Sequence, residues 1–243
     1  MKIKLSEEQK MIQQSVERFV QENYDLPNRI NISSEDPGFS KDYWSSMAEL
    51  GWLGLAFSEE EGGFGGNQID TLVLMEQFGK GLVLEPFLAN IVLGGGALKR
   101  SPATHLKEEL IPGLIDGSLQ ITLAYAEEQS RFDLNDIATS AREEGDKFII
   151  NGKKSMVLNA ESANKLIVVT RTSGGQTEEK GISLFSTKTG VLSSADVLLI
   201  KAGGKNDSEK RLRAASPIRP ISLRRSSGGG IKRLFRKIHN KSS

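Results

Sequence analysis

The sequence predicts an α+β protein in which an all-helical N-terminal domain precedes an antiparallel β domain and a mostly disordered basic C-terminal tail. Three features of the sequence support this fold class. Apolar residues recur at helical spacing up to about residue 117. From Leu119 onward, short runs of β-forming residues alternate with turn residues. After residue 185, Ser, Gly, Lys and Arg dominate, and such a composition buries too little apolar surface to offset chain entropy.

The N-terminal helix is indicated by both its cap and its apolar face. Ser6 can cap the first turn, and Gln9 can complete a capping box three residues later. Apolar side chains then recur at i, i+4, i+7 and i+8 from Ile12 to Val20, which places them on one helical face. A loop rich in Asn, Ser and Pro is expected at Asn28–Ser40. Further helices are predicted at 43–50, ending at Gly51, at 69–78, ending before Gly79, at 87–98, weakened by Gly94–Gly96, and at 106–114, interrupted at Pro112.

A change of hydrophobic period near Leu119 marks the β region. Asn151–Gly152 is a strong hairpin signal, because these residues readily adopt the positive φ angles of tight two-residue turns. We therefore expect Lys147–Ile150 and Met156–Leu158 to pair as the two strands of a hairpin. Further strands are predicted at Gln120–Ala126, Leu166–Thr170, Gly181–Phe185 and, in the tail, Val197–Ile200, with a turn at Ser173–Gly175.

The formal net charge of +1 conceals two oppositely charged parts. Residues 186–243 contain 14 Lys and Arg against 3 Asp and Glu, whereas residues 1–185 contain 18 against 28. A basic tail of this kind can contact nucleic acid or anionic lipid, and Ile231–Ile238 has the periodicity of a short basic amphipathic helix. No helix-turn-helix, RNA-recognition or zinc pattern accompanies the charge, so no specific nucleic-acid partner is expected.

Composition excludes much familiar chemistry. The chain has no Cys and only two His, which argues against disulfides, thiolate nucleophiles and Cys- or His-built metal sites. His105 stands at a helix start, where a surface or capping role outweighs catalysis, and no Ser/His/acid triad can be assembled. No apolar run reaches the roughly 18–20 residues of a membrane span. The N-terminus lacks an apolar signal core, so a cytoplasmic location is expected.

Two clusters admit a functional interpretation but favour a structural one. The glycines of Gly62–Gly66 could cradle a phosphate, yet no Lys-Ser/Thr follows and no strand precedes, which favours a tight structural turn. Glu127 and Glu128, at the end of the first strand, could supply a general base. Because adjacent strand residues point to opposite faces, they cannot act as a carboxylate pair, and we expect a solvated strand end.

Several segments resemble one enzyme family. Met47–Leu55 (MAELGWLGL), followed by Ser58–Gly66 (SEEEGGFGG), resembles the signature of the acyl-CoA dehydrogenases. Ala124–Glu128 lies where the family has a strand ending in Thr-Glu-Pro, and Asp146–Asn159 resembles its segment ending in Trp-Ile-Thr-Asn. The resemblance implies a helical domain at residues 1–117, a partial middle β-barrel domain at 118–185, or to 200, and a basic tail at 186–243.

The resemblance also implies flavin chemistry. In this family a Glu base removes the α-proton of an acyl-CoA thioester while the β-hydride passes to FAD, which yields a 2-enoyl-CoA. It further implies an electron-transferring flavoprotein as the oxidant of the flavin, and a homo- or hetero-oligomer. The Glu base lies in a C-terminal helical domain, so no catalytic residue is assigned in this sequence. The run Ser130–Leu134 resembles a divergent branch that works with small-subunit or heteromeric partners.

Alignment with the family implies five cofactor-binding positions. Tyr125 and Ala126 would offer main-chain amides to the flavin. Ala126, Phe132 and Leu158 stand where the family has Thr, Ser and Thr, and Met156 stands where a Trp packs on the flavin. Three hydroxyl groups are therefore missing, each of which contributes about 0.5–1.5 kcal/mol when it makes a hydrogen bond. We expect weakened FAD binding.

The abrupt change at residue 186 favours a frameshifted or truncated gene product whose tail replaces the helical C-terminal domain. We therefore expect no dehydrogenation by this chain alone. An alternative interpretation is a non-catalytic subunit or binding module that pairs with a complete acyl-CoA dehydrogenase.

Overall fold

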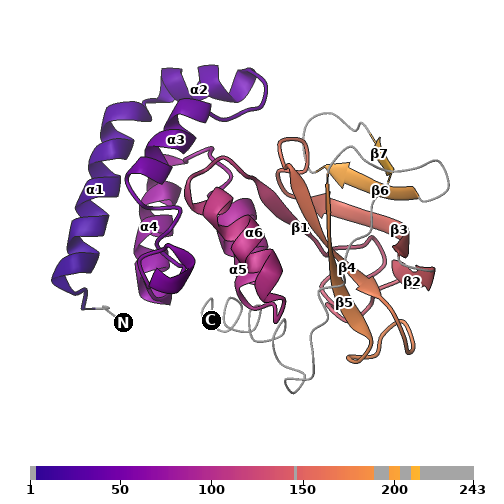
Figure 1. Cartoon of the computed structure of the whole chain (residues 1–243). Coiled ribbons are helices and arrows are strands. Elements are labelled where there is room, and N and C mark those ends of the chain that lie inside the picture. Colours follow the sequence, from indigo (N-terminus) through magenta and orange to yellow (C-terminus); the bar gives the residue numbers. More distant parts are fainter. Residues whose placement is uncertain (1–3, 145–146, 189–196, 203–208, 214–243) are drawn as a thin grey trace. The chain divides into compact units, whose positions relative to one another are not determined.

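The computed structural model describes residues 4–144, 147–188, 197–202 and 209–213 (Figure 1). The chain divides into two compact units. Unit 1 comprises Met1–Phe87 and Leu110–Ser118, and unit 2 comprises Leu88–Glu109 and Leu119–Ser243. Helices make up the described part of unit 1, whereas unit 2 combines helices with a sheet, so the predicted α+β class is confirmed.

Unit 1 is built on helices whose apolar faces share one core. The side chains of Val16, Met47, Leu53 and Leu74 are fully buried there. The predicted capping box of Ser6 is present, and it starts the first helix at the expected residue. The elements are α1 (Glu7–Asn23), α2 (Leu26–Ser34), α3 (Lys41–Glu49), the short η1 (Glu59–Glu61), α4 (Gln68–Gly81) and the end of α6 (Thr104–Ile115).

Two predictions in the helical region, one loop and one helix end, fail because local caps and packing outweigh composition. The expected loop at Asn28–Ser40 is wrong, since α2 occupies most of it. Asp25 caps this helix by accepting a hydrogen bond from the Asn28 N–H at 2.8 Å. The predicted stop before Gly79 is also wrong, because α4 runs on to Gly81. A Cβ at Gly81 would collide with Val20, so this glycine permits close packing of α4 on α1.

The glycine and proline interruptions expected in the next two helices are absent. Through Gly94 and Gly95 the chain stays helical, as the π-helix η2 (Leu88–Gly95), and continues into α5 (Gly96–Lys99). A Cβ at Gly94 would lie 2.9 Å from the carbonyl carbon of Ile121, so this glycine admits the neighbouring strand. Helix α6 likewise continues past Pro112, whose carbonyl accepts from the Asp116 N–H at 3.0 Å.

The sheet of unit 2 has the order β1-β4-β2-β3-β6-β7, with β5 paired to β4. The expectation of a purely antiparallel sheet is wrong, because β1 pairs with β4, β2 with β4, and β3 with β6 in parallel. The β2–β3 hairpin lies between β1 and β4 in sequence, and such a long connection permits parallel pairing. The strands are β1 (Ile121–Ala124), β2 (Ser140–Glu144), β3 (Lys147–Val157), β4 (Lys165–Arg171), β5 (Ile182–Lys188), β6 (Val197–Ala202) and β7 (Glu209–Arg213).

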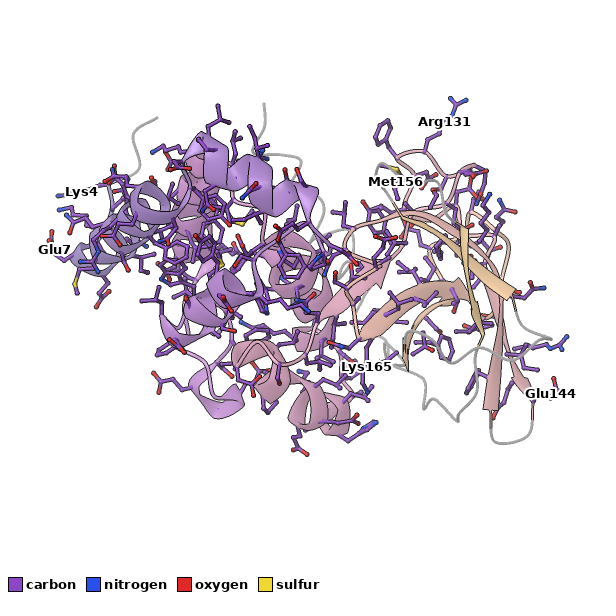
Figure 2. All side chains as sticks on the ribbon, turned by 90° about the horizontal axis from the view of Figure 1, so that it is seen from above. Lys4, Glu7, Arg131, Glu144, Met156 and Lys165 are labelled. Carbon is purple, nitrogen blue, oxygen red and sulfur yellow. The ribbon has the colours of Figure 1, made fainter. Side chains whose placement is uncertain are left out.

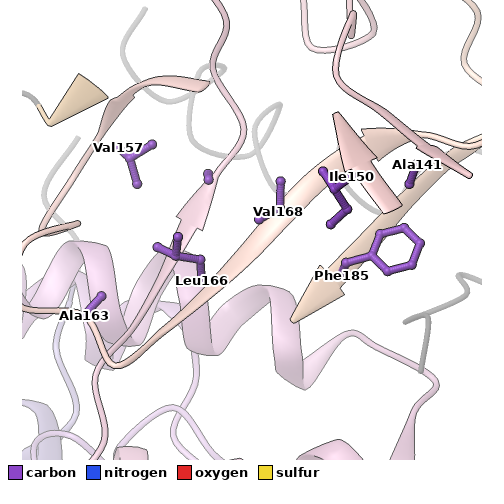
Figure 3. Packing of buried hydrophobic residues seen from close by; sticks show 8 residues of the cluster. Ala141, Ile150, Val157, Ala163, Leu166, Val168 and Phe185 are labelled. Carbon is purple, nitrogen blue, oxygen red and sulfur yellow. The ribbon is translucent and has the colours of Figure 1, made fainter. Parts of the chain in front are cut away.

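The predicted hairpin at Asn151–Gly152 is wrong. Strand β3 runs without a turn through both residues, and Asn151 pairs with Ser140 of β2. A Cβ at Gly152 would lie 2.5 Å from the Cα of Thr139, so this glycine permits a close approach of two backbones. The strands enclose an apolar core (Figure 3), whose buried members are Ala124, Ala141, Ile150, Val157, Ala163, Leu166, Val168 and Phe185.

Within the basic tail, the structure describes residues 197–202 and 209–213, which form strands β6 and β7. Strand β6 includes the predicted Val197–Ile200, and β7 was not predicted. The predicted amphipathic helix at Ile231–Ile238 and the second histidine, His239, lie outside the described residues. Among the residues that the structure describes, no helix is long and apolar enough to cross a membrane, and no group of His, Cys, Asp and Glu could hold a metal ion.

Candidate functional site

The five sequence-predicted cofactor positions lie on two segments of unit 2. Tyr125, Ala126 and Phe132 belong to the segment that follows β1, while Met156 and Leu158 lie at and just beyond the end of β3. The Ser155 N–H donates to the Ala126 carbonyl at 2.9 Å, which joins the two segments. Figure 2 shows Arg131 and Met156 at the same edge of the sheet. We call Tyr125, Ala126, Phe132, Met156 and Leu158 together the candidate cofactor surface.

The candidate cofactor surface is largely apolar and open to solvent. Phe132 is fully exposed at 101%, Met156 is 64% exposed and Leu158 is 39% exposed. In the described part of unit 2, Leu88 is the one other large hydrophobic residue with comparable exposure. Large apolar side chains exposed on two joined segments are candidates for contact with a ligand or another protein.

A β-bulge gives Met156 its exposure. Strand β3 pairs with β6 through Lys154 and again through Val157, and the register shifts between them. Met156 lies in this bulge with a φ of 53°, a left-handed conformation that is unfavourable for a side chain with a Cβ. Lys154, Ser155 and Val157 are buried on either side of it. The bulge therefore turns one apolar side chain outward from an otherwise buried strand end.

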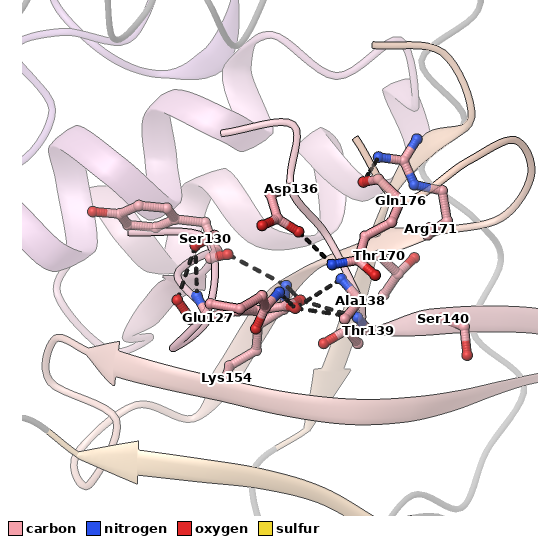
Figure 4. A network of polar contacts seen from close by, with 12 residues as sticks. Glu127, Ser130, Asp136, Ala138, Thr139, Ser140, Lys154, Thr170, Arg171 and Gln176 are labelled. Atoms are coloured by element: carbon pink, nitrogen blue, oxygen red, sulfur yellow. Dashed lines mark hydrogen bonds and ion pairs between the residues drawn. The ribbon is translucent and has the colours of Figure 1, made fainter. Parts of the chain in front are cut away.

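A buried ion pair lies within two residues of Ala126 and Met156 in the sequence. Lys154 Nζ lies 2.5 Å from Glu127 Oε1, and the two side chains are 0% and 2% exposed (Figure 4). The prediction of a solvated strand end is therefore wrong for Glu127. It holds for Glu128, which is exposed and pairs with Lys153 at 3.0 Å.

Hydrogen bonds fully engage the Glu127 carboxylate. The N–H groups of Ala138 and Thr139 donate to it at 2.8 and 3.1 Å, and Gln129 Nε2 donates at 2.6 Å. Burial opposes ionisation, but the hydrogen bonds from Lys154, Thr139 and Gln129 hold the pKa of Glu127 below its ordinary value. A carboxylate held in this way does not act as a general base.

The Lys154 ammonium group makes two hydrogen bonds. Besides the bond to Glu127, it donates to the Tyr125 carbonyl at 3.3 Å. Burial lowers the pKa of Lys154, and the hydrogen bond to Glu127 counteracts this effect. No sequence signal identified the pair, because its members are 27 positions apart and Lys154 was assigned to the connection of a hairpin that does not exist.

A second buried cation anchors the far end of the segment 127–139. The Arg171 guanidinium donates to the carbonyls of Asn135 and Gln176, each at 2.7 Å. It also donates to the carbonyls of Glu178 at 2.8 Å and Lys180 at 2.6 Å. The segment that carries Phe132 is thus fastened at Glu127 and again at Asn135. Sequence reasoning missed this anchor too.

The other sequence candidates have structural roles. In the Gly62–Gly66 loop, the N–H groups of Gly63, Gly65 and Gly66 donate to nearby main-chain carbonyls at 2.7–2.8 Å. These amides are therefore used inside a tight turn, as predicted. His105 is exposed on the first turn of α6, which agrees with its predicted surface role.

Comparison with known families accounts for both units. Residues 6–118 match the model of the acyl-CoA dehydrogenase N-terminal domain, and residues 122–201 match that of the acyl-CoA dehydrogenase middle domain. The chain belongs to the acyl-CoA dehydrogenase family. Its two matched regions follow each other in the order that the sequence resemblance implied.

Individual relatives of this acyl-CoA dehydrogenase homologue are distant. Mitochondrial isovaleryl-CoA dehydrogenase of Pongo abelii is 29% identical over 191 residues, which cover 77% of this chain and 45% of that protein. The caffeyl-CoA reductase–Etf complex subunit CarC of Acetobacterium woodii is 26% identical over 183 residues, covering 74% of this chain and 48% of that protein. The chain therefore spans about half the length of these curated relatives.

The fold also occurs in solved structures. The FAD complex of PigA superposes with a TM-score of 0.76 at 24% identity, covering 98% of this chain and 62% of that protein. At this level of identity the likeness concerns the fold.

Proposed function

We propose that this chain binds FAD on the candidate cofactor surface and serves as the flavin-binding portion of an acyl-CoA dehydrogenase. The reaction is the α,β-dehydrogenation of an acyl-CoA thioester to a 2-enoyl-CoA. When bound, FAD supplies the hydride-accepting chemistry of this reaction. The main support is the gathering of exposed Phe132, Met156 and Leu158 on two joined segments of unit 2. We further propose a border between the two domains near residue 117 and an end of the middle domain at 185 or near 200, the latter favoured by the family match to residue 201.

The residues present fit a flavin through apolar contact more than through hydrogen bonds. Met156 and Leu158 offer exposed apolar groups to a flat ring system. Within the described residues, the Ala126 N–H makes no hydrogen bond and can donate to a ligand. The missing hydroxyl groups at Ala126, Phe132 and Leu158 weaken the fit. We therefore propose weak FAD binding in which the protein excludes water from one side of the ring.

The proposed reaction also needs a base, and none of the five residues of the candidate cofactor surface is acidic. Glu127 is engaged by four donors and faces away from solvent. In the family the base comes from a C-terminal helical domain, whereas the matched regions here are the N-terminal and middle domains. We propose that the 243-residue polypeptide does not dehydrogenate acyl-CoA by itself.

The proposed reaction also involves partners. We propose an acyl-CoA substrate, an oligomer with another acyl-CoA dehydrogenase subunit, and an electron-transferring flavoprotein that reoxidises the flavin. One relative is named as a subunit of an Etf complex, which supports this class of partner. A second candidate function is a non-catalytic subunit that pairs with a complete acyl-CoA dehydrogenase. The exposure of Phe132 is compatible with this function too, because a protein partner could cover this side chain in place of a flavin.

Absorbance spectroscopy of the purified chain tests these proposals. The chain is titrated with FAD, alone and mixed with a complete acyl-CoA dehydrogenase subunit, and dye reduction by acyl-CoA is followed in both samples. A perturbed flavin spectrum without dye reduction by the chain alone supports the proposed function. Dye reduction by the chain alone would refute its inactivity. An unperturbed spectrum together with complex formation favours the non-catalytic subunit.

A further inference from the structure

We propose that Glu127 and Lys154 form a positioning pair, which sets the spacing and orientation of the two segments of the candidate cofactor surface. This inference rests on the proposed function, because it assigns the pair to the flavin surface. Neither residue would touch the flavin. Their role is to act through Ala126, which directly precedes Glu127, and Met156, which follows Lys154 by two residues.

The connectivity places the pair next to both segments of the surface. Glu127 follows Ala126, and Lys154 precedes Ser155, whose N–H donates to the Ala126 carbonyl at 2.9 Å. The ion pair, with 2.5 Å between Lys154 Nζ and Glu127 Oε1, therefore joins the residues next to this hydrogen bond on both segments. Any change in the Glu127–Lys154 distance therefore moves Ala126 relative to the bulge that carries Met156.

The two charged groups also orient the surrounding main chain. The carboxylate accepts from the N–H groups of Ala138 and Thr139, where the segment 127–139 returns to the sheet. The ammonium donates to the Tyr125 carbonyl, directly after the end of β1. The pair therefore joins three stretches of main chain: the exit of β1, the entry of β2 and the end of β3.

Stability alone is a poor explanation for such a pair. Taking two ions out of water is unfavourable, and well-packed apolar groups of similar volume often stabilise a fold as well or better. Apolar packing, however, lacks directional contacts. The neighbouring backbone needs such contacts, because Arg131 and Met156 both adopt left-handed conformations, with φ of 47° and 53°.

The test uses a double variant that removes both charges but keeps the side-chain volume, Glu127→Gln with Lys154→Met. The matched control is Glu109→Gln with Lys165→Met, which removes an ion pair of 3.0 Å within the same unit. Two properties are measured in the full chain: amide hydrogen exchange without ligand, and FAD affinity by absorbance titration. Thermal unfolding checks that both variants fold.

A positioning role predicts a local effect. In the double variant, amides of 126–132 and 155–158 should exchange about tenfold faster or more, while the control variant resembles the wild type. FAD affinity should fall by about tenfold or more, since small misplacements at a site have large effects. Exchange and affinity that match the control variant would overturn the proposal, as would faster exchange throughout unit 2.

The test remains decisive if the wild-type chain does not bind FAD or if the double variant does not fold. If the wild-type chain does not bind FAD, the proposed function fails, and hydrogen exchange still decides whether the pair positions these segments. If the double variant does not fold, Gln129→Met decides instead, because its exposed side chain donates to Glu127 Oε2 at 2.6 Å. Faster exchange at 155–158 in this variant supports the positioning role, and unchanged exchange there contradicts it.

Discussion

Glu85 accepts a hydrogen bond from the Ser40 N–H at 3.2 Å, and its second carboxylate oxygen accepts from the Tyr24 hydroxyl. Ser40 is the N-cap of α3, and Tyr24 is the C-cap of α1. One buried carboxylate thus joins the end of one helix to the start of another. Burial raises the pKa of Glu85 from 4.5 to about 7, so this junction is sensitive to pH.

We predict that unit 1 loses stability as the pH rises through 7. Because the pKa of Glu85 is higher in the folded than in the unfolded chain, its stabilising effect is complete below about pH 4.5 and is lost above 7. The loss amounts to about 3 kcal/mol at most. Urea unfolding at pH 5.5 and 8.5 should show about 2 kcal/mol of this loss, because part of it has already occurred at pH 5.5. In Glu85→Gln the difference between the two pH values should shrink, and an unchanged difference would exclude Glu85 as its source.

Arg171 should not tolerate lysine. A lysine keeps the charge but presents a single nitrogen, which cannot reach the four carbonyls that the guanidinium fork contacts. We expect Arg171→Lys to cost about 2–4 kcal/mol and to increase proteolysis within 172–181 and 127–139. The control is Arg142→Lys, since Arg142 is exposed and contacts Glu144 at 3.3 Å. Equal stability of the two variants would show that the Arg171 contacts contribute little.

Two glycines should respond to alanine in opposite directions. At Gly152 the added Cβ would meet Thr139, so Gly152→Ala should destabilise unit 2 by about 1–3 kcal/mol. At Gly79, inside α4, a Cβ meets no atom within 4 Å, and alanine should stabilise the helix by about 0.5–1 kcal/mol. Chemical unfolding followed by circular dichroism measures both effects. Destabilisation by both substitutions would contradict the helical position of Gly79.

Restoring hydroxyl groups to the candidate cofactor surface should strengthen FAD binding. Ala126→Thr and Leu158→Thr place hydroxyls on the two segments, and each is expected to raise the affinity by about 2–10-fold. The absorbance titration with FAD measures the gain. As a control, Leu88→Thr introduces a hydroxyl at another exposed apolar position of the same unit. An equal gain in the control would show that the effect is unspecific.

Local physics made several elements predictable from sequence. The capping box of Ser6 and Gln9 and the apolar spacing that follows specify α1, because each signal acts within a few residues. The β-branched run at Leu166–Thr170 likewise predicted β4, and the signature at Met47–Leu55 led to the family. The candidate cofactor positions came from the same resemblance.

Tertiary structure alone decided the arrangement of the candidate site. Asn151–Gly152 has the local chemistry of a turn, but its close approach to Thr139 keeps it within a strand. Glu127 lies just after a strand, where the sequence predicts a solvated residue. Its burial depends on the ion pair with Lys154, which is 27 positions away in the sequence. The sequence therefore determined the helical and strand segments and the family, since these depend on near neighbours. Three features depend on contacts between segments that are distant in the sequence: the parallel pairing, the bulge at Met156 and the buried ion pair. Local sequence patterns do not predict such contacts.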